Sequence, residues 1–285
     1  MKEVENRIAQ KMDLIQDTFL RIQDVFFKTP DWRGDIKDLV EANVEFRSIA
    51  YESASMSIAL DDLKQNNQLA NWLEFVNTIG KAHATQVHVG LGWAFAQTLT
   101  PPMDYLPLFH SMQRYRVLDG YGYYESLFRR RRSIMHHLKL NLADATASGA
   151  LDQGIGRGTW YLNKGDFAAT QEMIAGFQPE RHNDLYRGLG IAIAYVGGAT
   201  EETLKQIIEA AGNFKAQLAT GAAMALISRH KAGYITNDAE LACKVFSGKS
   251  AAEVIKANET ITAAINTEAN DAYLTWITGI EKFIH

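Results

Sequence analysis

Short Gly-x-Gly segments recur at nearly even intervals along the 285-residue chain, and this repetition constrains its fold more than any other feature. The segment His88–Ala96 aligns without a gap to Tyr186–Ala194. Related segments begin at Gly120 and Gly154, and a weaker copy begins at Ala219. The spacings of 30, 34, 34 and 31 residues between positions 90, 120, 154, 188 and 219 suit two short helices and their turns. The chain is therefore predicted to be a tandem array of helical hairpins, a TPR-like α-solenoid.

The apolar pattern predicts an all-α fold. No turn dipeptide lies between alternating apolar residues, as a β-hairpin would require. An N-terminal amphipathic helix that ends before Pro30 is predicted from an apolar stripe at steps of three and four: Val4, Ile8, Met12, Ile15, Phe19, Ile22 and Phe26. We expect an N-terminal helical segment, residues 1–46, followed by one continuous helical-repeat domain, residues 47–285.

Capping patterns predict helix starts near residues 201, 238 and 251. They are Thr200 before Glu201 and Glu202, Asn237 with Glu240, and Ser250 with Glu253. The Pro101–Pro102 pair must interrupt any helix that runs through it, and so marks a connection between helices.

Polar residues beside the glycines are the candidates for function, because equivalent positions of stacked repeats face one concave side. The candidates for proton transfer are His88, Glu52, Asp119 and Asp152. The candidates for ligand contact are Tyr51, Trp93, Tyr123, Gln153, Arg157, Trp160, Asp184, Tyr186 and Arg187. Further aromatics near the glycines are Phe95, Tyr121, Tyr124 and Tyr161. A structural role is the alternative for each residue, since carboxylates cap helices, arginines tie repeats together and aromatics fill cores.

His88 is the leading acid–base candidate, because an unperturbed imidazole titrates near neutral pH. No metal site is expected, since His83 and His88 are five residues apart and do not share a helical face. No cofactor is expected either. A dinucleotide fingerprint needs a preceding strand, and no strand is predicted before these glycines.

Charge, cysteine content and hydropathy exclude several classes of protein. A net charge of -4 gives no overall attraction to nucleic acid, and no apolar run is long enough to cross a membrane. The single cysteine, Cys243, excludes an intramolecular disulfide. The N-terminus lacks the apolar region of a signal peptide. A cytoplasmic location is therefore expected.

The segments Arg116–Gly122, Asp152–Arg157 and Asp184–Ala192 resemble those of UnbL-type accessory proteins, a bacterial family found in enediyne polyketide gene clusters. The resemblance extends from about Tyr51 to the C-terminal segment. It implies a part in maturing a polyene or enediyne-type natural product, and it supplies no catalytic residues.

Two hypotheses follow for the groove. In the first it binds, and can transform, a long hydrophobic or polyene-type intermediate, free or bound to a carrier protein. In the second it is a non-catalytic adaptor that receives a peptide or helix of a biosynthetic protein partner. An enclosed pocket with converging ionisable groups would favour the first, and an open charged face the second.

Overall fold

The computed structural model describes residues 2–28, 32–140, 142 and 144–285, and within these ranges the chain forms helices and no strand. The predicted all-α class is confirmed. The α-helices are α1 (Lys2–Lys28), α2 (Trp32–Glu41), α3 (Arg47–Gln65), α4 (Ala70–Asn77), α5 (Ala84–Thr98), α6 (Arg114–Phe128), α7 (Ala145–Leu162), α8 (Phe167–Ala175), α9 (His182–Val196), α10 (Glu201–Ala210), α11 (Lys215–Lys231), α12 (Asn237–Ser247), α13 (Ala251–Ala264) and α14 (Ala272–Ile284). None of these helices combines the length and apolar content that a membrane span needs.

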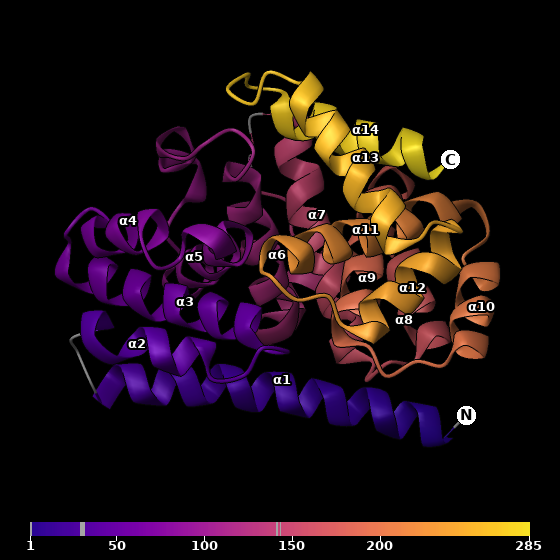
Figure 1. Cartoon of the computed structure of the whole chain (residues 1–285), viewed down its shortest axis with the longest axis horizontal. Coiled ribbons are helices and arrows are strands. Elements are labelled where there is room, and N and C mark those ends of the chain that lie inside the picture. The colour runs from indigo at the N-terminus through magenta and orange to yellow at the C-terminus, as the bar shows by residue number, and fades with distance from the viewer. Residues whose placement is uncertain (1, 29–31, 141, 143) are drawn as a thin grey trace.

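Six helices form a stack at the centre of the molecule, in the order α3, α5, α6, α7, α9 and α11 (Figure 1). Each helix packs directly on the next, although a connecting segment separates each pair in sequence. The glycines explain this arrangement. Residues two apart on an α-helix point about 200° apart, so the two glycines of Gly-x-Gly lie on opposite faces of their helix. Each such helix can therefore approach one neighbour on each side.

On α6 this close approach is visible at both glycines. A Cβ atom added at Gly120 would lie 2.0 Å from the carbonyl oxygen of Val89 on α5, and one added at Gly122 would lie 2.1 Å from that of Leu151 on α7. Any side chain would push the helices apart. The same contacts recur along the stack, at Gly90, Gly92, Gly154, Gly156, Gly188, Gly190 and Gly221. In the last copy Gly221 takes the place of the first glycine, so the predicted start at Ala219 is wrong by two residues.

The connections between stacked helices differ from one another. The predicted second helices are present as α8, α10 and α12. The connection from α5 to α6 instead contains two short 3₁₀ turns, and the connection from α6 to α7 contains a π-helical turn, Arg131–Met135. The repeat is therefore regular in its glycine-bearing helices and irregular between them.

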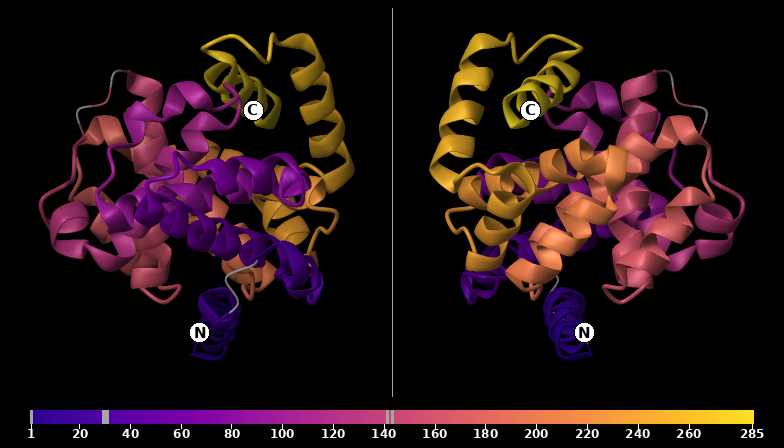
Figure 2. Two further views of the ribbon diagram at one scale, coloured as in Figure 1. Left: turned by 90° about the vertical axis from the view of Figure 1, so that its left-hand side faces the viewer. Right: turned by 90° about the vertical axis from the view of Figure 1, so that its right-hand side faces the viewer.

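Helices at two opposite edges cover the stack from outside. Helix α1 runs along one edge and packs against α3 and α9, whereas α13 and α14 lie along the opposite edge (Figures 1 and 2). The predicted amphipathic stripe of α1 is confirmed, because the side chains of Ile8, Met12, Ile15, Ile22 and Phe26 are buried. Pro30, which was expected to lie beyond this helix, is outside the described residues. Helix α2 ends at Glu41 and α3 begins at Arg47, on either side of the predicted boundary at residue 46.

The predicted helix starts at 201, 238 and 251 are confirmed to within one residue by α10, α12 and α13. Ser250 and Glu253 form a complete capping box, and the Thr200 side chain caps α10. The assignment of Asn237 as a cap is wrong. The side chain of Thr236 accepts the hydrogen bond from the Ala239 backbone N–H, and Asn237 is the first helical residue.

Candidate functional site

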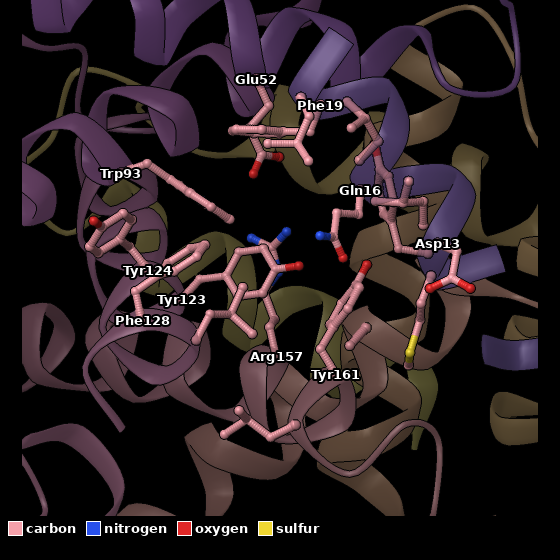
Figure 3. A pocket seen from close by; sticks show the side chains of 18 of the residues that line it. Asp13, Gln16, Phe19, Glu52, Trp93, Tyr123, Tyr124, Phe128, Arg157 and Tyr161 are labelled. Atoms are coloured by element: carbon pink, nitrogen blue, oxygen red, sulfur yellow. The ribbon is translucent and has the colours of Figure 1, made fainter. Parts of the chain in front are cut away.

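A cavity of about 640 Å³ lies between α1 and the stacked helices (Figure 3). We call it the α1 cavity. Its size falls within the range of small-molecule sites. Helix α1 supplies one wall through Ala9, Met12, Asp13, Ile15, Gln16, Phe19, Leu20 and Gln23. The other helices supply Ile49, Glu52, Met56, Trp93, Gln97, Tyr123, Tyr124, Leu127, Phe128, Arg157, Tyr161, Leu162, Ala192 and Tyr195, and Lys164 lies just beyond α7.

Several of the side chains that the stack contributes occupy corresponding positions after the first glycine of their helix. The position three residues after the first glycine is Trp93 on α5, Tyr123 on α6 and Arg157 on α7, and all three line the cavity. The position four residues further along is Tyr161 on α7 and Tyr195 on α9, which also line it. Residues at these spacings share one helical face. The stacked helices therefore present corresponding positions to the same space.

Aromatic rings form one side of the cavity. The ring of Trp93 lies 4.9 Å from that of Phe19 on α1 and meets Tyr123 edge-on at 5.0 Å. Tyr124 and Phe128 pack edge-on against the same indole from further along α6, at 5.7 and 5.8 Å. Rings in such contact offer an apolar surface that suits a flat, unsaturated chain.

A buried polar group adjoins this aromatic side of the α1 cavity. In Figure 3 the carboxylate of Glu52 and the guanidinium of Arg157 enter the space from opposite sides. Arg157 Nη1 donates to Asp119 Oδ1 at 2.8 Å, and its guanidinium lies 4.4 Å from the centre of the Tyr123 ring. Gln153 Nε2 donates to the second oxygen of Asp119 at 2.6 Å. Asp119 and Gln153 thus fix Arg157 from behind without lining the cavity themselves.

Burial raises the pKa of Glu52 to about 7, against the opposing effect of Arg157 and with a further upward contribution from Asp119. The side chain is only 3 % exposed, and within the described part of the chain its carboxylate accepts no hydrogen bond. Burial by itself would lower the pKa of Arg157, but the nearby carboxylates of Asp119 and Glu52 more than offset this and raise it. Arg157 is a permanent cation, while Glu52 can gain or lose a proton near neutral pH.

Three phenols lie around Glu52 and Arg157, and all three remain protonated at neutral pH. Burial raises the pKa of Tyr161 to about 12, and it also raises the pKa values of Tyr123 and Tyr195. The Tyr195 hydroxyl accepts a hydrogen bond of 3.0 Å from Gln86 Nε2. Phenols in this state can donate hydrogen bonds to a carbonyl or an oxyanion.

Other predicted site residues lie away from the α1 cavity. His88 is buried against Trp72 and Phe109, and its Nδ1 lies 2.7 Å from the Ala84 carbonyl oxygen. Burial lowers the pKa of His88 to about 4, so its ring is neutral. Tyr51 stacks on the imidazole of His83 at 3.8 Å and donates to Glu41. These contacts do not bring either residue to the cavity.

The remaining predicted residues contact the connecting segments, pair within one helix or lie in the core. Asp152 accepts hydrogen bonds from Arg181, which also donates to the carbonyl oxygens of His137 and Leu138. Arg187 pairs with Asp184 one turn earlier on α9. The ring of Tyr186 stacks on Phe214 at 4.3 Å, and Trp160 lies in the core with 1 % exposure.

Four of the candidates for proton transfer or ligand contact therefore line the α1 cavity, as do Tyr124 and Tyr161 of the further aromatics, and two more candidates support it. Glu52, Trp93, Tyr123 and Arg157 line it, while Asp119 and Gln153 form the layer behind. The prediction missed Phe19, Gln16 and Tyr195. Tyr195 could have been predicted, because it lies seven residues after the first glycine of its helix. No sequence signal indicated that α1 lies across the stack.

Among the described residues no group of three histidine, cysteine, aspartate or glutamate side chains is arranged to hold a metal ion. The chemistry that these residues support is proton transfer at Glu52 beside a fixed positive charge.

The sequence profile of one family, described as a protein of unknown function (DUF1702), matches residues 1–284, and the chain belongs to this family. No curated protein and no solved structure matches the chain.

Proposed function

We propose that this member of the DUF1702 family binds a long hydrophobic, polyene-type intermediate in the α1 cavity, with the polar end of that molecule between Glu52 and Arg157. The observation that carries the proposal is the combination of a 640 Å³ cavity, an aromatic wall and one buried acid–base pair in a single space. Specific small-molecule sites characteristically join an apolar lining to a few convergent polar groups.

The Glu52–Arg157 pair suits a ligand whose polar group is a neutral carbonyl better than one with a free carboxylate. Asp119 already neutralises part of the charge of Arg157, and Glu52 adds a second carboxyl to the same cation. A ligand carboxylate would bring a third carboxyl group to one arginine. A neutral carbonyl oxygen can accept hydrogen bonds from Arg157 or Tyr161 and leaves the charge of the cluster unchanged.

Glu52 is the residue that we assign to proton transfer. A carboxyl group whose pKa is near 7 can be either acid or base at physiological pH. When deprotonated, it can remove a proton from a carbon activated by a carbonyl group held at Arg157. The resemblance to UnbL-type proteins supports a polyene as the ligand and natural-product maturation as the context.

The adaptor hypothesis is the alternative, in which a TPR-like surface receives a biosynthetic protein partner. The ligand-binding hypothesis is favoured because Glu52 and Arg157 lie inside a cavity that α1 covers. An adaptor would be expected to present such groups on an open face.

The binding test uses cis-parinaric acid methyl ester, a fluorescent conjugated tetraene with a neutral carbonyl end. We expect saturable enhancement of its fluorescence by the protein. Ala192→Phe should weaken the affinity at least about tenfold, because Ala192 lines the cavity and the added ring occupies ligand space. Ala263→Phe, on the exposed side of α13, is the matched control and should bind as the parent protein does.

Equal affinity in the parent and in folded Ala192→Phe would contradict the assignment of the cavity. Native mass spectrometry of protein purified from its own host separates the two hypotheses. A retained small hydrophobic molecule supports the ligand site, and a stoichiometric polypeptide supports the adaptor.

A further inference from the structure

Arg116 on α6, whose guanidinium faces α14, is a buried arginine that has no counter-charge among the described residues. Its side chain is 8 % exposed, and within the described part of the chain its guanidinium forms no hydrogen bond and no ion pair. Its Nε is fully buried and unpartnered. The guanidinium lies over the rings of Tyr273 and Trp276 on α14, at 5.0 and 5.4 Å from their centres.

Other buried arginines of this protein have partners for their guanidinium groups. Arg157 pairs with Asp119, and Arg181 pairs with Asp152. Arg229 donates to the carbonyl oxygens of Glu45 and Tyr195. A buried charge without a partner is costly, and aromatic faces compensate only part of that cost.

A small cavity of about 20 Å³ lies beside Arg116, and a second cation borders it. This cation is Lys231, at the end of α11, which keeps contact with solvent. Burial, and secondly the charge of Arg116, lowers the pKa of Lys231. Among the residues that the structure describes, no carboxylate lines this cavity, whose remaining walls are Thr85, Met112, Gln113, Met224, Ile227, Ser228 and Trp276. The nearest acidic residue along α6, Asp119, is already held by Gln153 and Arg157.

We propose that a small monovalent anion, either a carboxylate group or a halide, binds between Arg116 and Lys231. The anion would connect α6, α11 and α14, since Arg116, Lys231 and Trp276 come from these three helices. The size of the anion follows from the cavity. A space of 20 Å³ holds on the order of one or two water-sized atoms, which suits one halide ion or the two oxygens of a carboxylate group. Sulfate and phosphate are too large for it.

The site would stabilise the packing of α14 on the stack. An anion that binds only the folded protein at concentration c adds RT ln(1 + c/Kd) to the unfolding free energy, and so raises the unfolding temperature as its concentration increases. The site is independent of the α1 cavity, so its presence or absence leaves the proposed function untouched.

Thermal unfolding tests this inference at constant ionic strength, with sodium sulfate as the background salt replaced stepwise by sodium formate in one series and by sodium chloride in the other. General salt effects on proteins differ between these anions, so the readout is the difference between the parent and its variants. Lys231→Met should lose the part of the Tm increase that comes from anion binding, so that its Tm rises less than the parent's as formate or chloride replaces sulfate. Arg131→Met, at an exposed arginine outside the cavity, should keep it.

Arg116→Met should behave as Lys231→Met does, and if it fails to fold, the Lys231 variant decides. A response to formate alone identifies a carboxylate site, and a response to chloride as well identifies a site that also takes halides. A crystal grown in sodium bromide should show an anomalous peak between the two side chains.

Equal Tm responses in the parent and in Lys231→Met would overturn the proposal. A bromide peak found together with such equal responses would mark an adventitious ion only.

Discussion

Arg157 donates a hydrogen bond of 2.8 Å to Asp119, and this pairing determines how much positive charge faces the α1 cavity. Two carboxyl groups, those of Asp119 and Glu52, share this one buried cation. Asp119 also accepts from Gln153, whereas Glu52 has no hydrogen bond among the described residues. Glu52 is the group of this cluster that retains its proton up to about pH 7.

Glu52 should make the stability of the protein depend on pH. Its pKa rises from an ordinary value of 4.5 to about 7 on folding, so the folded protein binds the proton more tightly than the unfolded chain. Protonation of Glu52 therefore adds to the unfolding free energy. This contribution is complete below about pH 4.5 and is lost as the pH rises through 7. The loss amounts to about 3 kcal/mol.

Urea unfolding of the parent and of Glu52→Gln between these pH values measures the effect. The glutamine variant cannot ionise, so its unfolding free energy should lack this decline. Parallel pH profiles for the two proteins would show that Glu52 has an ordinary pKa.

Asp119→Asn should lower the pKa of Glu52, because the Asp119 charge raises it and because Arg157 would be left with Glu52 as its carboxylate partner. The variant should also lose about 3–5 kcal/mol of stability, as expected when one member of a buried ion pair is removed. The Glu52-dependent decline in unfolding free energy should then move to lower pH. Asp184→Asn is the control, since Asp184 pairs with Arg187 outside the cavity and should leave the decline at its original pH.

Gly120→Ala should destabilise the stack by more than about 3 kcal/mol, because the added methyl group would lie 2.0 Å from the Val89 carbonyl oxygen. The same change at Gly34 in α2 meets nothing within 4 Å and should stabilise the protein by about 0.5–1 kcal/mol. Chemical denaturation of the two variants gives the comparison. Similar small effects at both positions would mean that the close packing of α5 on α6 is relaxed in solution.

His88 should remain neutral throughout the physiological pH range. Burial lowers its pKa to about 4, and Nδ1 is close to the Ala84 carbonyl oxygen, an arrangement that fixes one tautomer. The imidazole resonances of His88, followed by NMR, should be constant from about pH 8 down to about pH 5. A midpoint near the ordinary value of 6.5 would restore His88 as an acid–base candidate.

The amino-acid sequence by itself determined the helical class, the helix starts at Thr200 and Ser250, and the close packing of the glycine-bearing helices. These properties are local. A capping side chain acts within three residues, and two glycines separated by one residue lie on opposite faces of any α-helix.

Only the tertiary structure decided which residues share the α1 cavity. The apolar stripe of α1 shows that one face is buried, but it does not identify the surface that buries it, so the contact between Phe19 and Trp93 could not be foreseen. Glu52 and Arg157 are likewise brought together by the order of helices in the stack and not by their spacing in sequence. The residues beside each glycine mostly face neighbouring helices, because the glycine brings the backbones of the two helices into close contact at that position. The side chains that reach the cavity lie one turn further along, where the space that α1 covers opens.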